Sequence, residues 1–390
     1  MVESITDPVP AEVRSSRLPA LDVLRGIAIL GTLGTNIWIF TNGEGLLGYV
    51  AHSDAPHGVW LWVERFLQQL AQGKFLGLLT IMFGIGLAIQ QRSAARAGRA
   101  WPGGYPIRAA LLLLDGVLNF FLVAEFDVLT GYAVTGLVVA FVLATGPRAQ
   151  RVWLIVAASI HIAMLTFIAV VIVAAPQGDS TPRKPLDPNP YADGSFWDLV
   201  AFRWEHLLVF RLEPLFIFPM SIALFLLGAR LFRAGVFEPS GARIRKRLMV
   251  LGFAVAAPID LVAGMTGGDL ILLTRYGTAP LVSLGILALV AEFYTRRPAP
   301  GFPARRFAEV GRMALSCYVL QNLVSGFLCY GWGLGLTTRV SADARVPFTV
   351  GIYLLVCALM LVFAHLWLRR FERGPVEWLW HSGYRALARG

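Results

Sequence analysis

The stretch LDVLRGIAILGTLGTN, residues 21–36, decides the class of fold. With the apolar residues that follow, it is long enough to cross a membrane as a helix, because about 20 residues span roughly 30 Å of hydrocarbon. It nevertheless carries Asp22, Arg25 and Asn36. A charge at mid-membrane costs roughly 2.5–3.5 kcal/mol on insertion scales, so such groups are kept for pairing, packing or chemistry.

The rest of the chain has the composition of a membrane protein. Of its 390 residues 56% are hydrophobic and only 15% are charged, and the mean hydropathy is +0.64. Apolar runs of helical length recur, and short alternating segments typical of a barrel do not. We therefore predict an all-α bundle of about ten spans, at 21–41, 66–90, 107–124, 127–145, 152–174, 206–231, 248–265, 270–294, 310–330 and 346–368. The third and fourth spans should form a tight hairpin.

Basic residues indicate the orientation of the bundle, since cytoplasmic loops are enriched in them. Most of them precede the first span or follow an even-numbered span. They are Arg14, Arg17, Arg92, Arg96, Arg99, Arg148, Arg151, Arg230, Arg233, Arg243, Arg245, Lys246, Arg247, Arg296, Arg297, Arg305, Arg306, Arg369, Arg370 and Arg373. This pattern predicts that both termini are cytoplasmic.

The domain organisation follows from the spans. Residues 1–20 form a cytoplasmic tail without a cleavable signal pattern, 21–372 the transmembrane domain, and 373–390 a cytoplasmic interfacial helix and tail. The net charge of +10 is spread in small groups beside the spans, which favours lipid headgroups over nucleic acid as partners. The sequence leaves a homodimer open.

No metal or disulfide site is expected. Cys317, Cys329 and Cys357 lie in apolar spans without CxxC or Cys/His spacing, so we interpret them as small core residues. The long loop near 176–205 is rich in proline and aromatic residues, which favours an interfacial anchor over a lid. The segment 42–65 has the same two interpretations.

Two helices carry a polar stripe. Arg25, Thr32 and Asn36 are spaced by seven and four residues, which keeps them within about 40° on one helix face. Gly31 and Gly34 would let a neighbouring helix approach closely.

The third span repeats the spacing with Arg108, Asp115 and Asn119. Mutual pairing, in which Asp22 or Asp115 meets an arginine, is the simplest explanation for any single residue. The whole set favours a functional cavity more strongly, because further polar residues lie in or beside apolar spans. These are Lys74, Asp127, His161, Asp260, Arg312, Gln321, Asn322 and His365.

Two of these residues have a simpler interpretation of equal or greater weight. Lys74 lies near the outer third of its span, where its ammonium would snorkel to water as readily as serve a site. His161, alone in an apolar helix, is more typical of a hydrogen-bonded core residue than of a base.

Several segments together resemble the YeiB family of bacterial multi-pass membrane proteins. They are LDVLRGIAILGTLGTN, QGKFLGLLTIMFGIGLAI, DGVLNFFLVAEFDVLTGYAVTGL, GRMALSCYVLQNLVSGFLCYGWGLGL and RRFERGPVEWLW. The resemblance covers essentially the whole chain and implies its architecture more than an activity. It also implies a location in the cytoplasmic (inner) membrane of a bacterium. Relatives commonly carry histidine at the position of Asn119 and asparagine at that of Cys317, and an asparagine cannot serve as a general base near neutral pH.

The opening motif is also similar to membrane acyltransferases of the heparan-alpha-glucosaminide N-acetyltransferase type. That similarity implies an acyl donor on the cytoplasmic side and an acceptor on the other. Arg25 would match the arginine near the donor, and Asn36 the asparagine at the reaction centre. Those enzymes also carry a histidine about a dozen residues later, whereas His52 and His57 come later than that here.

We therefore expect acyl transfer from a cytoplasmic donor, with acyl-CoA as the candidate and no tightly bound cofactor, to a small-molecule, glycan or lipid acceptor. Three arginines, Arg25, Arg108 and Arg312, would hold the donor phosphates. Asn36, Lys74 and Asp127 are the candidate catalytic residues. The residues expected to line the cavity are Asp22, Thr32, Asp115, Asn119 and Gln321. A small-molecule transporter using the same stripes is the alternative.

Overall fold

The protein is all-α in the residues that the computed structural model describes, 18–52, 55–174, 184–268, 270–297 and 301–387. Within these residues, eight helical segments are long and apolar enough to cross a membrane. They are Pro19–Phe40 (α1), Val59–Arg96 (α3 and α4), Tyr105–Leu122 (α5), Pro147–Ala174 (α7), Leu207–Arg233 (α9 and α10), Pro239–Thr266 (η1, α11, η2 and α12), Leu270–Arg296 (α13, η3 and α14) and Ala342–Trp367 (η5 and α17).

Two shorter apolar helices, Leu129–Leu143 (α6) and Ala314–Cys329 (α16), stand where the other two expected spans were placed. Each expected span therefore coincides with a helix. The second differs from its predicted bounds, because the helix begins at Val59 and breaks between Val59–Ala71 (α3) and Lys74–Arg96 (α4). Gly73 at the break has φ +71°, and a Cβ there would lie 2.3 Å from the carbonyl oxygen of Arg275, so only glycine fits.

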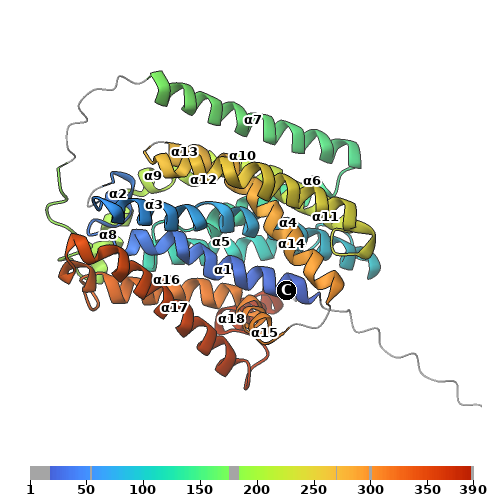
Figure 1. Cartoon of the computed structure of the whole chain (residues 1–390). Helices are drawn as coiled ribbons and strands as arrows, with labels where there is room; N and C mark the ends of the chain where they lie inside the picture. Colours follow the sequence, from blue (N-terminus) through green and yellow to red (C-terminus); the bar gives the residue numbers. More distant parts are fainter. Residues whose placement is uncertain (1–17, 53–54, 175–183, 269, 298–300, 388–390) are drawn as a thin grey trace, which may run out of the picture.

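Helix α1 lies inside the bundle, packed against α4, α16, α17 and the helix Phe302–Arg312 (α15). A Cβ on Gly31 would lie 2.2 Å from the ring of Phe75, and one on Gly34 would lie 3.0 Å from the Ala71 side chain. The close approach predicted at both glycines is thus confirmed. Figure 1 shows α1 running through the bundle toward the short helix Gly45–Val50 (α2).

The tight hairpin predicted for the third and fourth spans is present as α5 and α6. Its turn is held by Glu125, which accepts hydrogen bonds from the Tyr191 hydroxyl at 2.9 Å and from Arg203 Nε at 3.1 Å. Arg203 lies on the helix Phe196–Glu205 (α8), at the end of the predicted long loop. Trp197 and Trp204 of α8 are 69% and 67% exposed, which suits the expected interfacial anchor.

Two helices lie at the edge of the bundle. Helix α7 contacts mainly α10, and only 11% of its most apolar window is buried, as expected for a lipid-facing helix (Figure 1). The expected interfacial helix is Pro375–Leu387 (α18), which packs against α5 and α16. The predicted tail falls almost entirely on residues 1–17, outside the described residues.

Candidate functional site

A cavity of about 460 Å³ opens at the end of the bundle where α1 begins. We call it the cationic cavity, because four arginines and a single carboxylate line it. These charged residues are Arg25, Arg108, Arg312, Arg373 and Glu377. The three arginines predicted to hold a donor, which lie as far apart as positions 25 and 312 in the chain, are therefore brought together.

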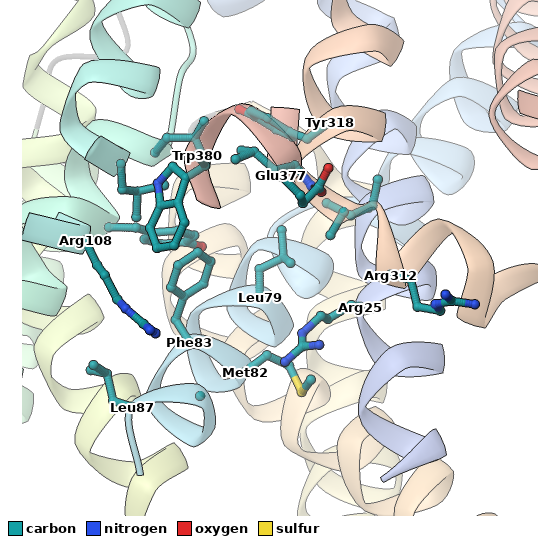
Figure 2. Close-up of a pocket in the computed structure, with 18 of the residues that line it drawn as sticks. Arg25, Leu79, Met82, Phe83, Leu87, Arg108, Arg312, Tyr318, Glu377 and Trp380 are labelled. Carbon is teal, nitrogen blue, oxygen red and sulfur yellow. The ribbon is translucent and has the colours of Figure 1, made fainter. Parts of the chain in front are cut away.

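Each of the three predicted arginines comes from a different helix. Arg25 on α1 pairs with Asp22 at 3.1 Å, as the pairing hypothesis foresaw. Arg108 on α5 donates to Gln90 Oε1 at 2.6 Å, and Arg312 at the end of α15 donates to the carbonyl oxygen of Glu372 at 3.3 Å. Figure 2 shows Arg25 and Arg108 on opposite sides of the cavity, with Arg312 at its rim.

Among the described residues, Glu377 forms its hydrogen bonds with α16. Its Oε1 accepts the backbone N–H groups of Leu315 (2.8 Å) and Ser316 (3.2 Å), and its Oε2 accepts the Ser316 hydroxyl. A carboxylate in this position satisfies the free donors at the start of α16. Glu377 therefore fastens α18 to α16, and the cavity keeps an excess of positive charge.

The inner wall of the cationic cavity is apolar. Leu79, Met82, Phe83 and Leu87 of α4 face it, and Figure 2 shows Met82 and Phe83 between Arg25 and Arg108. Clefts that bind small molecules combine mostly apolar walls with a few placed polar groups. This cavity has the shape and chemistry for a ligand with an anionic part near the opening and an apolar part inside.

Helix α18 supplies a histidine to the same cavity. Burial, together with the guanidinium groups of Arg373, Arg385 and Arg108, lowers the pKa of His381 below its usual range. The His381 Nε2 atom is buried, and among the described residues it has no hydrogen-bond partner. The local potential is therefore positive enough to disfavour a further proton.

A second cavity, of about 470 Å³, lies toward the other end of the bundle. We call it the apolar cavity; Leu46 and Leu47 of α2, Gly131 of α6 and Ile217 of α10 are among the residues that line it. Val128 and Tyr132 line both this cavity and the cationic one, so they stand between the two. The Tyr132 hydroxyl is held at 2.7 Å from that of Thr80.

The inner residues of the two stripes do not line either cavity. Thr32 donates to the carbonyl oxygen of Ile29 in its own helix, at 2.8 Å. Asn36 donates to Asn322 Oδ1 at 3.4 Å, and Asn119 donates to Asp127 Oδ1 at 3.0 Å. The structure thus brings the arginines of the two stripes together in one cavity. Thr32, Asn36 and Asn119 instead form hydrogen bonds within a helix or between neighbouring segments.

Asp115 and Gln321 have buried polar atoms without partners among the described residues, as does Asn119 at its Oδ1. Among the described residues, Asp115 Oδ2 has no hydrogen-bond partner. The same is true of both amide atoms of Gln321, Nε2 and Oε1. Gln321 is fully buried. Such orphaned atoms are rare and costly, so mutual pairing does not account for these two residues.

Lys74 and Asp127, two of the candidate catalytic residues, already have partners in the protein. Lys74 Nζ lies 2.5 Å from Asp260 Oδ2, and Asp260 is also held by Gln69 and Thr278. Asp127 lines the apolar cavity and caps the start of α6, where its oxygens accept from the backbone of Leu129 and Thr130. Their catalytic roles, like that of Asn36, stay predictions.

Sequence reasoning missed the contribution of α18. We interpreted the C-terminal segment as an anchor, although Glu377, Trp380 and His381 all line the cationic cavity. The signal available was Glu377 in RRFERGPVEWLW, a carboxylate that follows three arginines within eight residues. His161 matches its simpler interpretation, with Nε2 2.9 Å from the carbonyl oxygen of Tyr276.

Comparisons with known proteins agree with this architecture. A family model described as a protein of unknown function (DUF418) matches residues 231–386, which include Arg312, α16 and most of α18. The uncharacterized protein YxaH of Bacillus subtilis (strain 168) is 29% identical over 391 residues, covering 94% of each chain. The uncharacterized protein YeiB of Escherichia coli (strain K12) is 27% identical over 384 residues, covering 93% of this chain and 94% of its own. These similarities confirm the resemblance to the YeiB family that the sequence indicated, and the chain is a multi-pass membrane protein similar to YxaH and YeiB over nearly its whole length.

Proposed function

We propose that the protein transfers an acyl group from a phosphorylated thioester donor such as acyl-CoA, bound in the cationic cavity, to an acceptor in the membrane or at its other face. One observation carries this proposal. Arg25, Arg108 and Arg312 converge on a single cavity whose inner wall is apolar. Guanidinium groups bind phosphate through paired hydrogen bonds, and the apolar wall suits an acyl chain.

The reaction needs the acyl carbonyl and the acceptor to meet. An acceptor oxygen or nitrogen attacks the thioester carbonyl carbon, the new bond to carbon forms, and the carbon–sulfur bond breaks. The proton of the acceptor ends on the sulfur, so that free thiol leaves. The donor and the acceptor would meet near Val128 and Tyr132, because these two residues line both the cationic and the apolar cavity.

In this scheme the arginine-rich end faces the cytoplasm of a bacterium, where the donor is made, which agrees with the distribution of basic residues. Asn36, Gln321 and Asn322 are candidates for stabilising the oxyanion. Removing one oxyanion donor typically costs about 2.7–4 kcal/mol of the barrier. Asp127 and Lys74 remain the candidate bases.

Binding of the donor is the first test. Unfolding of the purified protein in detergent is followed with and without a long-chain acyl-CoA, for the wild type and Arg108→Gln. Loss of one charged hydrogen bond is worth about 1.5–3 kcal/mol, so affinity should fall tenfold or more. Arg151→Gln, on the exposed start of α7, is the matched control. Equal stabilisation of all three proteins, or of none, would overturn the donor site.

A transporter is the second candidate. The two cavities separated by Val128 and Tyr132 favour it, since two cavities toward opposite ends of the bundle that are closed from each other suit alternating access. The two functions differ in one readout. An acyltransferase releases CoA thiol from acyl-CoA in detergent solution when lipid extract is added, whereas a transporter requires sealed vesicles and leaves its substrate unchanged.

A further inference from the structure

We infer that the end of the bundle opposite the cationic cavity holds a lipid with a neutral, hydroxyl-bearing head, such as a sugar. Its chain would lie in the apolar cavity and its head in a smaller neighbouring one. This inference rests on the proposed function in one respect, since it makes this lipid the acyl acceptor. The binding site itself is argued from the residues at that end alone.

The site for the head is a cavity of about 180 Å³, which we call the polar cavity. It has the liquid volume of about six waters, room for one small polar ring. Its polar lining residues come from α3, α10, α17, the π-helical segment Thr274–Thr278 (η3) and the residues that directly follow α1 and α3. They include Asn42, Glu64, Gln68, Gln72, Glu213, Arg275 and Arg345.

The charges of the polar cavity balance, unlike those of the cationic cavity. Two carboxylates, Glu64 and Glu213, stand against two arginines, Arg275 and Arg345. Arg275 Nη2 lies 2.8 Å from Glu213 Oε1, so this pair is already neutralised within the wall. A phosphate head would be repelled by the two carboxylates. Hydroxyl groups both donate and accept hydrogen bonds, so they can bind carboxylates, amides and arginines alike.

An orphaned acceptor in the same cavity points to a bound donor group. Gln72 is 3% exposed, and among the described residues its Oε1 has no hydrogen-bond partner. The ring of Trp38 and the ring of Tyr49 also line the cavity. A buried amide oxygen beside aromatic walls is the arrangement expected for a hydroxylated ring, because such a ring has donors at its edge and apolar C–H faces.

The apolar cavity continues directly from the polar one. Six residues line both: Leu46, Val50, Phe126, Glu213, Leu272 and Tyr276. The rim of the apolar cavity includes Val50, Val209 and Leu212, which are 65%, 51% and 62% exposed. Figure 1 shows α2 and α9 (Leu207–Phe210) at this end of the bundle. In a membrane such a rim faces lipid, so a lipid chain would enter sideways.

This placement puts the lipid chain directly beyond Val128 and Tyr132, which line the cationic and the apolar cavity, and the head beside Phe126, which lines the apolar and the polar cavity. The head must therefore move past Phe126 toward Val128 to meet the donor thioester. In the transfer, a hydroxyl oxygen of the lipid head attacks the thioester carbonyl. A carbon–oxygen bond forms, the carbon–sulfur bond breaks, and the hydroxyl proton leaves on the CoA thiol. The products are an O-acylated lipid and free CoA.

The test is lipid retention by the full chain in phosphatidylcholine nanodiscs, measured by native mass spectrometry without any acyl donor. The probe is monoglucosyl diacylglycerol, compared with diacylglycerol and with phosphatidylglycerol. We expect the glucosyl lipid to be retained at least fivefold more than either. Equal retention of diacylglycerol would overturn the head site, and preferred phosphatidylglycerol would overturn its neutral class.

Two glycine variants then locate the chain, and one glutamine variant locates the head. Gly131→Leu fills the apolar cavity, and its added Cβ meets only Pro214 at 4.0 Å; it should lower retention of the glucosyl lipid at least fivefold. Gly351→Leu on lipid-facing α17 meets nothing within 4 Å and should leave retention unchanged. Gln72→Met, which removes the orphaned acceptor and the amide donors, should lower retention of the glucosyl lipid without affecting diacylglycerol. Equal retention by Gly131→Leu and Gly351→Leu would overturn the proposed chain site.

Gly86→Leu separates this inference from the proposed function. Gly86 lines the cationic cavity, and an added Cβ there meets nothing within 4 Å. The variant should lose acyl-CoA binding and keep the glucosyl lipid. If no protein binds acyl-CoA while the glucosyl preference and the Gly131 effect stand, the proposed function fails and the lipid site remains.

Discussion

The turn between α5 and α6 and the cationic cavity both hold arginine away from bulk water, but they satisfy it differently. Arg203 at the turn is 2% exposed and donates to Glu125 and to the carbonyl oxygens of Phe121 and Val123. Arg108 in the cavity has a neutral amide partner, Gln90, and stacks on Tyr384 with its guanidinium carbon 4.6 Å from the ring centre.

This difference separates arginines that build the fold from those that are available to a ligand. A buried guanidinium with a carboxylate and two carbonyls has its charge and donors accounted for. A guanidinium beside a neutral amide keeps its net charge, and an anion completes its environment. Arg245, 2% exposed and 2.6 Å from Glu292, belongs to the first kind.

The largest effect is expected at the turn. Glu125→Gln leaves the Arg203 charge buried without a counter-charge, which should lower the free energy of unfolding by about 3–5 kcal/mol. The measurement is the unfolding transition in detergent. Glu205→Gln, an exposed neighbour on α8, is the control and should shift stability by less than about 0.5 kcal/mol. A shift at Glu125 no larger than the control would erase the distinction between the two regions.

The next effect concerns the ion pair of Lys74 with Asp260, in which another cation is fully paired. Lys74→Met and Asp260→Asn should each cost about 3 kcal/mol, because each leaves one buried charge alone, whereas the double variant should cost clearly less than their sum. Thermal unfolding of the four proteins measures the coupling. A double variant that is stable but releases no CoA from acyl-CoA would instead support the predicted role of Lys74 as a base.

A smaller effect is expected when charge is kept and geometry is changed in the cavity. Arg108→Lys retains a positive charge but loses the planar fork and the stacking on Tyr384. We expect acyl-CoA to bind about three- to tenfold more weakly, with nearly unchanged stability. Calorimetric titration checks this prediction. Binding at the wild-type level would mean that Arg108 contributes charge alone.

The smallest effect is a pH dependence that involves His381. Its lowered pKa makes it neutral near pH 7, and a bound polyanion should raise that pKa, so proton binding and acyl-CoA binding favour each other. Affinity should therefore increase about threefold as pH falls from 7.5 to 6, equivalent to about half a pKa unit of coupling. His381→Gln should flatten this dependence; an unchanged slope would assign it to another group.

Much of the architecture was readable from the sequence. Apolar runs placed the spans, because hydrocarbon accepts only continuous apolar helices, and the spacing of Arg108 from Asn119 placed both on one face. The break at Gly73 was not readable, since it depends on the carbonyl of Arg275 some two hundred residues later. The role of α18 in the cavity was also not readable from the sequence. An aromatic amphipathic segment has the same pattern whether it lies on lipid or closes a cavity.

By itself, the sequence determined that this chain is a helical membrane protein, which residues are polar within its spans, and that Arg25 and Arg108 begin two polar faces. Only the tertiary structure decided which of those residues share a cavity and which pair with each other. The physical reason is that helical periodicity sets the direction of a side chain around its own axis, while the partner it meets depends on how separate helices pack. Lys74 with Asp260 and Arg108 with Gln90 look alike as polar residues in apolar spans, and packing alone makes one a closed ion pair and the other part of an open cationic cavity.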